Sequence, residues 1–331
     1  MQKYPLRACR GVSKRLARVI VGTLEIANWA SCSSSNGAHA DTPGLVDSTM
    51  NTGLGGSATT GVGGATTGDG GVATDRGGTT DSAGDVPAVA APPPVFVAAS
   101  YYPDIKASLT PGDHVGASAI RVLTNGQFVF VQQRFDDAIA ELGAFDSIDR
   151  GVVKSLTFSA LADVAAHLDD VPKEITWIGF DMEPGMTPAD EIDPSNYVST
   201  VEQFAQIVQK SRRKVSWGPI SSAFDGLEKA GQLGAVLAAV DAAVYQGQQL
   251  FENQGAKAFE DEMQRQRAIV KGHNQNVDFN AQLWVTLQKP DQVIEGFNLA
   301  HADLDLAVIG TPASVPSTDI QHILDGLAWR K

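Results

Sequence analysis

From Val95 onward, short apolar segments alternate with longer segments of helical periodicity. Strands are predicted at residues 95–101, 116–122, 127–132, 175–183, 214–219, 242–246, 277–286 and 304–309. Helices are predicted at residues 156–168, 197–211, 224–240, 256–271, 291–300 and 318–329. Strands joined through helices form parallel sheets with right-handed crossovers. We therefore expect an α/β fold, a TIM-like (β/α)8 barrel, with an open doubly wound sheet as the alternative.

The part of the chain before Val95 has a composition that cannot form a core. Residues 33–94 are mostly Gly, Ser, Thr, Ala, Asp and Pro, and they include no Phe, Trp or Tyr. Such a segment buries too little apolar surface to offset about 1–2 kcal/mol of backbone entropy per residue. It is predicted to be a disordered linker, which leaves residues 95–331 as the barrel domain.

Residues 1–32 resemble a bacterial lipoprotein signal. Six basic residues precede an apolar run at 19–30, which is too short to span a bilayer, and Ala30-Ser31-Cys32 follows. The resemblance implies lipidation at Cys32 and export, with the domain either lipid-anchored at the bacterial cell envelope or secreted. The alternative is a protein that stays in the cytoplasm and has a disordered basic start.

Charge and residue usage exclude several classes of function. The formal net charge is -13, which disfavours nucleic acid as a partner because phosphate binding needs a basic face. Both cysteines, Cys9 and Cys32, precede the barrel, and the histidines form no metal-binding motif. We expect no metal and no cofactor, and a membrane contact only through a lipid anchor.

The most informative stretch for function is the apolar run that begins at Ile175 and ends in Asp181-Met182-Glu183-Pro184-Gly185. Residues two apart on a strand face the same side, so both acids are expected on one face at the carboxyl end. In parallel barrels this end carries the catalytic residues. Two adjacent carboxyls also raise the pKa of one of them, as a general acid requires. The alternative is a pair that caps a helix or holds a loop.

The same residues resemble the family-18 glycoside hydrolases, the chitinases and their relatives, whose fourth strand ends in Asp-x-Asp-x-Glu. Here the last part matches, while Gly179 replaces the earlier Asp. The family's Ser-x-Gly-Gly is missing from 127–134, and its Tyr-Asp pair is replaced by Tyr245-Gln246. The resemblance implies that Glu183 is the general acid and that Asp181 orients the acetamido group of an N-acetylated glycan.

Other polar and aromatic residues are predicted near the same strand ends, where sugars bind by stacking and hydrogen bonding. The substrate-binding candidates are Tyr101, Tyr102, Trp217, Tyr245, Gln246, Gln248, Gln282 and Trp284. For the aromatic residues, packing in the core is the alternative. Glu252 is a spare acid in this region, and His114 is expected on a loop.

Three functions are consistent with these features. The first is hydrolysis of a glycosidic bond with Asp181 and Glu183 as catalytic residues and a carbohydrate substrate. The second is a non-catalytic carbohydrate-binding barrel on a lipoprotein tether. The third is a lyase or isomerase that binds Mg²⁺ through the same two acids.

Overall fold

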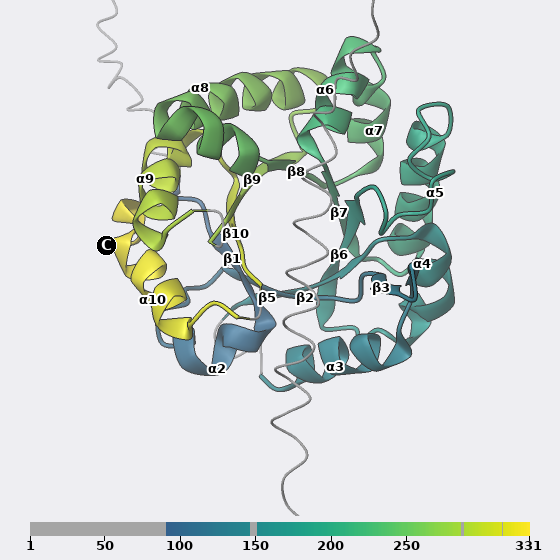
Figure 1. Cartoon of the computed structure of the whole chain (residues 1–331), viewed down its shortest axis with the longest axis horizontal. Helices are drawn as coiled ribbons and strands as arrows, with labels where there is room; N and C mark the ends of the chain where they lie inside the picture. Colours follow the sequence, from purple (N-terminus) through teal and green to yellow (C-terminus); the bar gives the residue numbers. More distant parts are fainter. Residues whose placement is uncertain (1–90, 146–150, 286–287, 313) are drawn as a thin grey trace, which may run out of the picture. The chain divides into compact units, whose positions relative to one another are not determined.

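The barrel is closed. A computed structural model describes residues 91–145, 151–285, 288–312 and 314–331, and in it eight parallel strands follow the order β1-β10-β9-β8-β7-β6-β5-β2 (Figure 1). The strands are β1 (Val95–Ala98), β2 (His114–Ser118), β5 (Val153–Phe158), β6 (Ile175–Met182), β7 (Lys214–Pro219), β8 (Ala242–Gln246), β9 (Asp278–Trp284) and β10 (Leu306–Gly310). Because β1 pairs with both β2 and β10, the sheet has no edge. The predicted TIM-like (β/α)8 barrel is confirmed, and the open sheet is excluded.

Helices follow every barrel strand and form the outer ring (Figure 1). They are α2 (Tyr102–Ile105), α3 (Gln132–Gly143), α4 (Leu161–His167), α5 (Tyr197–Lys210), α6 (Ser221–Lys229), α7 (Leu233–Ala239), α8 (Gln248–His273), α9 (Pro290–Ala300) and α10 (Ser317–Gly326). The described residues also form four short 3-10 helices, η1 (Ala99–Tyr101), η3 (Leu168–Asp170), η4 (His301–Asp303) and η5 (Ala328–Arg330). A search of the described helices finds none with the length and apolar character needed to cross a membrane.

Ring contacts between strands and helices show which side chains face outward. Phe180 of β6 stacks on Phe204 of α5 with ring centroids 4.1 Å apart. Trp217 of β7 stacks on Phe224 of α6 at 5.5 Å. Since side chains alternate along a strand, the residues beside them, Asp181 among them, face the barrel interior.

The third barrel strand differs from the prediction. Residues 127–132 do not enter the barrel; instead β4 (Gln127–Val129) pairs antiparallel with β3 (Val122–Thr124) in a separate hairpin. The barrel strand is β5, and its last residues were predicted as the start of a helix, which actually begins at Leu161. The remaining predicted strands overlap the observed ones. The predicted signal (1–32) and nearly all of the predicted linker (33–94) lie outside the described residues.

Aspartates close the amino-terminal rim of the barrel. Asp113, Asp241 and Asp305 each precede a strand and accept a backbone N–H from the neighbouring strand, at 2.9, 2.8 and 2.8 Å respectively. Asp113 also accepts hydrogen bonds from both terminal nitrogens of Arg330, at 2.8 and 2.9 Å. This arrangement satisfies backbone donors that would otherwise be left without a partner at the strand starts.

Candidate active site

Asp181 and Glu183 lie at the carboxyl end of β6. Asp181 pairs in register with Gly218 of β7 and is half-buried, whereas the Glu183 side chain is only 4% exposed. A tight turn follows, in which the Thr187 backbone N–H donates to the Glu183 carbonyl at 2.9 Å. The Thr187 hydroxyl accepts the Glu183 N–H at 3.0 Å. Gly185, with φ of +93°, takes the left-handed conformation that the turn requires.

The two carboxyls form a hydrogen-bonded pair. Burial raises the pKa of Glu183 to about 7, although the hydrogen bonds that Glu183 accepts from Gln246 and from Asp181 act in the opposite direction. The pKa of Asp181 is also raised well above its ordinary value, first by burial and then by the adjacent Glu183 charge and hydrogen bond. Two carboxyls this close cannot both ionise easily, so the pair retains one proton near neutral pH.

A chain of amide side chains leads to Glu183 from the end of β8 and the residues beyond it. Gln246, at the end of β8, donates from Nε2 to Glu183 Oε1 at 2.7 Å. Gln248, at the start of α8, donates to Gln246 Oε1 at a longer 3.4 Å. Gln288, which is not among the candidates predicted from the sequence, donates to the Gln248 backbone carbonyl at 3.1 Å. Gln246 is therefore placed to orient Glu183.

Small polar residues line the barrel interior below the pair. In register across three strands lie Thr157, Gly179 and Ser216. A Cβ atom built at Gly179 would lie 2.7 Å from Thr157 Oγ1 and 3.3 Å from Ser216 Oγ, so the position has no room for a side chain. Thr157 and Ser216 are half-buried and were not predicted as site residues. Thr157 lies in the segment that the sequence predicts as a helix, and the position of Ser216 beside Gly179 depends on strand register, so no local pattern identifies either residue.

Gln282 and Trp284 of β9 also face the interior. Both lie against Gly310 of β10, where an added Cβ would come within 2.8 Å of Gln282 Nε2 and 3.0 Å of the Trp284 ring. Both side chains are half-buried. Their role in binding a substrate stays a prediction.

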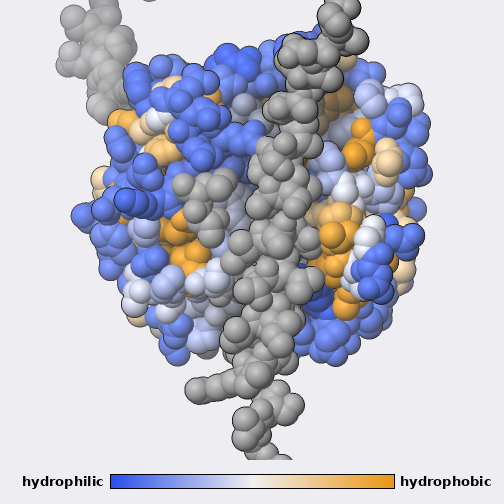
Figure 2. All heavy atoms as spheres, in the orientation of Figure 1, coloured by the Kyte–Doolittle hydropathy of each residue, from blue (hydrophilic) through white to orange (hydrophobic). Residues whose placement is uncertain are grey.

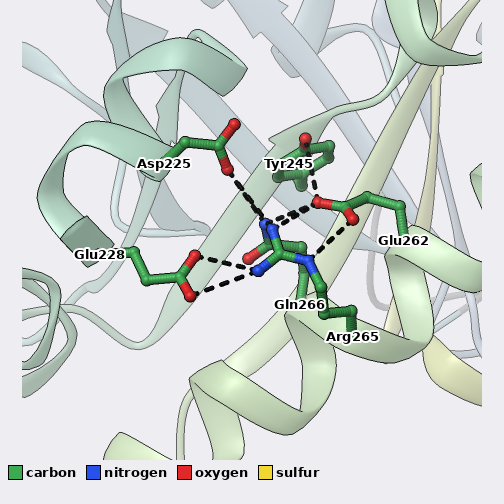
Figure 3. A network of polar contacts seen from close by, with 6 residues as sticks. All are labelled: Asp225, Glu228, Tyr245, Glu262, Arg265 and Gln266. Atoms are coloured by element: carbon green, nitrogen blue, oxygen red, sulfur yellow. Dashed lines mark hydrogen bonds and ion pairs between the residues drawn. The ribbon is translucent and has the colours of Figure 1, made fainter. Parts of the chain in front are cut away.

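Trp217 and Tyr245 lie on the other side of the sheet, so their prediction as substrate-binding residues is wrong. Trp217 is fully buried between β7 and the helices. Tyr245 points to α8, where its hydroxyl donates to Glu262 at 3.4 Å. Figure 3 shows that Tyr245 lies beside a network of polar side chains from α6 and α8, namely Asp225, Glu228, Glu262, Arg265 and Gln266.

Tyr101 and Tyr102 are packed rather than open to a ligand. Tyr101 is 5% exposed, and its hydroxyl donates to the Pro312 carbonyl at 2.8 Å. Tyr102 stacks on Phe145 with ring centroids 3.9 Å apart. Neither ring therefore offers a free face for a sugar, contrary to the prediction.

The remaining candidates make no recorded contact with the pair or lie outside the described residues. Glu252 is exposed on α8. His114 starts β2 at the opposite end of the barrel, with its ring 5.6 Å from that of Trp177. Cys32 lies outside the described residues. Within the described ranges, no group of three or more His, Cys, Asp or Glu side chains is arranged to hold a metal ion.

Comparisons with known proteins assign the chain to no family. No model of a known protein family matches the chain, and no curated protein matches it. Among solved structures, the barrel is similar to 3-keto-L-gulonate-6-phosphate decarboxylase from Vibrio cholerae. That similarity has a TM-score of 0.43 and 9% identity, and covers 72% of this chain and 97% of the other. It carries no argument about activity.

The expected resemblance to the family-18 glycoside hydrolases is wrong. No model of that family, or of any other known family, matches the chain. The packing explains one departure, because Gly179 has no room for the carboxylate that the family motif places there. The Ser-x-Gly-Gly motif is missing from the true third strand as well, which reads Val153-Lys154-Ser155-Leu156-Thr157-Phe158.

Proposed function

We propose that this chain is an acid–base enzyme of the lyase or isomerase type, which transfers protons on a neutral, hydroxyl-bearing substrate at the carboxyl end of the barrel. The observation that carries the proposal is the hydrogen-bonded Asp181–Glu183 pair, in which burial raises the pKa of Glu183 to about 7. General acid–base catalysis is most efficient when the pKa of the catalytic group lies near the working pH.

A pair that shares one proton supplies both halves of such a reaction. Its ionised carboxylate accepts a proton from a carbon or oxygen of the substrate, and its protonated carboxyl returns one to another atom. Glu183 is the proposed proton-transfer residue, because Gln246 fixes its orientation at 2.7 Å. Asp181 is its partner, since its own raised pKa depends partly on the Glu183 charge.

The described residues that face the interior near the pair are uncharged, which supports a neutral substrate. The interior-facing groups around the pair are hydroxyls and amides, from Thr157, Ser216, Gln246 and Gln282, with the indole of Trp284. Such groups bind substrate hydroxyls, and an aromatic ring packs on the apolar face of a sugar. The pair itself carries a negative charge at neutral pH, which would repel a phosphorylated substrate.

The hydrogen-bond partners of Asp181 and Glu183 support proton transfer by these residues rather than catalysis by a bound Mg²⁺ ion. Mg²⁺ is normally held by carboxylate and other oxygen ligands with several waters. Here the two carboxyls hydrogen-bond to each other, and Gln246 directs an N–H donor at Glu183. Turnover should therefore be unchanged when MgCl₂ replaces EDTA in the assay.

A deuterium-incorporation assay tests the reaction class. The full chain is incubated in D₂O with a panel of neutral aldoses, ketoses, polyols and oligosaccharides, and products are followed by NMR. A lyase or isomerase incorporates deuterium at a carbon that does not exchange in buffer alone. Glycosidic hydrolysis instead releases a new reducing end without carbon-bound deuterium, and that result would contradict the proposal.

The matched variants are Glu183→Gln and Glu252→Gln, which make the same chemical change at a buried and at an exposed position. We expect Glu183→Gln to lower the rate by about 10²–10⁴-fold, the usual contribution of general acid–base catalysis, and Glu252→Gln to leave it unchanged. Equal rates for the two variants would remove Glu183 from the mechanism.

A further inference from the structure

The β3–β4 hairpin is an addition to the barrel. It is inserted between β2 and α3, and its strands pair through Val122 with Val129, Leu123 with Phe128, and Thr124 with Gln127. Asn125 and Gly126 connect the strands with φ angles of 51° and 80°. Two consecutive residues with positive φ form the tight turn whose twist matches a two-stranded hairpin. The hairpin is therefore a locally determined unit.

Residues at both ends of the hairpin contact α4. Arg121 makes two bonds to Asp163, at 2.7 and 2.9 Å. At the other end, Phe130 stacks on His167 with ring centroids 4.4 Å apart and an interplanar angle of 13°. A paired Arg–carboxylate contact and a ring stack hold the base in a defined orientation.

The hairpin contacts the turn that follows Glu183. A Cβ atom added to Gly185 would lie 2.9 Å from Phe128 Cε2, so the Phe128 ring lies directly on this glycine. A second connection runs from Arg121 N to the Ser159 hydroxyl at 2.9 Å, and from that hydroxyl to the Met186 carbonyl at 3.5 Å. Figure 2 shows apolar side chains at the surface in the part of the view where Figure 1 draws β3 and β6.

Movement of this turn would be transmitted to Glu183. Thr187 links the end of the turn to the Glu183 backbone through two hydrogen bonds, at 2.9 and 3.0 Å. We propose that the β3–β4 hairpin is a positioning element of the active site, and that Phe128, through Gly185, holds the turn that orients Glu183. This inference rests on the proposed role of Glu183.

The two faces of the hairpin supply a matched control. Phe128 is half-buried toward the turn, whereas Val129, the next residue, points the opposite way and is 36% exposed. Phe128→Ala and Val129→Ala therefore shorten neighbouring apolar side chains of the same hairpin. Only the first change removes the contact with Gly185.

The titration of Glu183 is a measurement that needs no known substrate. The full chain is labelled with ¹³C at the Glu carboxyl, and Glu183 is assigned by its loss in Glu183→Gln. In Phe128→Ala, a loosened turn admits water to the pair, so the titration midpoint should fall by about 1 unit toward the ordinary Glu value. Phe128→Leu, which refills the contact, and Val129→Ala should titrate like the wild type.

The outcomes separate this inference from the proposed function. If Glu183 of the wild type titrates at the ordinary Glu value, the proposed function fails first. If its midpoint is raised in the wild type and unchanged in Phe128→Ala, the positioning role is overturned and the proposed function stands. If Phe128→Ala does not fold, as judged by circular dichroism, Phe128→Val is titrated in its place under the same criteria.

Discussion

The two rims of the barrel use acidic residues in opposite ways. At the amino-terminal rim, Asp113 and Asp305 each accept a backbone N–H and form ion pairs with Arg or Lys side chains. At the carboxyl-terminal rim, Asp181 and Glu183 hydrogen-bond to each other, and neither has an ion pair within the described residues. The contacts of Asp305 favour its ionised form, whereas the Asp181–Glu183 pair retains a proton.

The pKa shifts express this difference. Burial alone would raise the pKa of Asp305, but hydrogen bonds from Lys271, the Phe279 backbone and Arg267 lower it overall. Burial raises the pKa of Glu183, where amide and carboxyl partners compensate only in part. In TIM-type barrels the amino-terminal face serves stability and the carboxyl-terminal face serves catalysis. Each rim should therefore respond differently to mutation and to pH.

The largest effect on stability is expected at the amino-terminal rim. Arg330→Ala leaves Asp113, which is fully buried, without its cation, although Val95 and Thr110 still donate to it. Breaking a buried pair by removing one partner costs about 3–5 kcal/mol. Urea unfolding followed by circular dichroism measures the loss, with Lys331→Ala, the exposed neighbouring residue, as the control. A loss below about 1 kcal/mol would show that this pair behaves like a surface pair.

At the carboxyl-terminal rim, by contrast, replacing an acidic side chain is expected to increase the stability of the protein at high pH. Because the pKa of Glu183 is about 7 in the folded protein and lower when unfolded, the folded state binds the proton more tightly. The contribution of protonated Glu183 to stability is complete at pH values below the pKa of the unfolded state, and it is lost as pH rises through about 7. Glu183→Gln removes this dependence, so at pH 8 the variant should be about 2–3 kcal/mol more stable than the wild type.

Thermal unfolding at pH 5 and pH 8 measures this effect. The wild type should lose stability between the two values, and Glu183→Gln should lose less. Glu252→Gln, the exposed control, should follow the wild type. If Glu183→Gln is destabilised equally at both pH values, the carboxyl pair is a structural contact and carries no retained proton.

Much of the barrel is predictable because strand alternation and apolar runs are local properties of sequence. The third strand was missed because Leu156 and Phe158, which face outward, fit a helical period as well as a strand. The prediction of a barrel strand at 127–132 is wrong although Asn125-Gly126, just before it, is a typical hairpin turn. Which of two apolar runs enters the barrel depends on long-range pairing that no local pattern specifies.

The alternation of side chains along a strand predicts part of the candidate site. Asp181 and Gln246 face inward as alternation requires. The same rule separates Tyr245 from Gln246, because adjacent residues on a strand cannot share a face. The contact between Gln246 and Glu183 was not predictable, since it joins residues 63 positions apart on strands that are not neighbours.

A smaller effect at the carboxyl-terminal rim is expected from Gln246→Leu. The hydrogen bond from Gln246 favours the ionised form of Glu183, so its loss should raise the pKa of Glu183 above about 7. The change in ionisation free energy should be about 1.5 kcal/mol, typical of a hydrogen bond to a charged group. Carboxyl ¹³C titration measures it, with Gln282→Leu as the matched control. A lowered pKa would mean that Gln246 does not act on Glu183 as a donor.

The smallest effect is expected from Arg267→Ala at the amino-terminal rim. Asp305 retains Lys271 at 2.8 Å and the Phe279 N–H at 2.8 Å, and all three charged side chains are partly exposed. The cost at pH 7 should be about 0.5–1 kcal/mol. Because the folded-state pKa of Asp305 is lowered, this contribution is present above the ordinary Asp pKa and is lost as pH falls through the folded value. Urea unfolding at pH 7 and pH 3 should therefore show the difference shrinking in acid, opposite in direction to Glu183→Gln, and a difference that grows in acid would contradict the contrast between the rims.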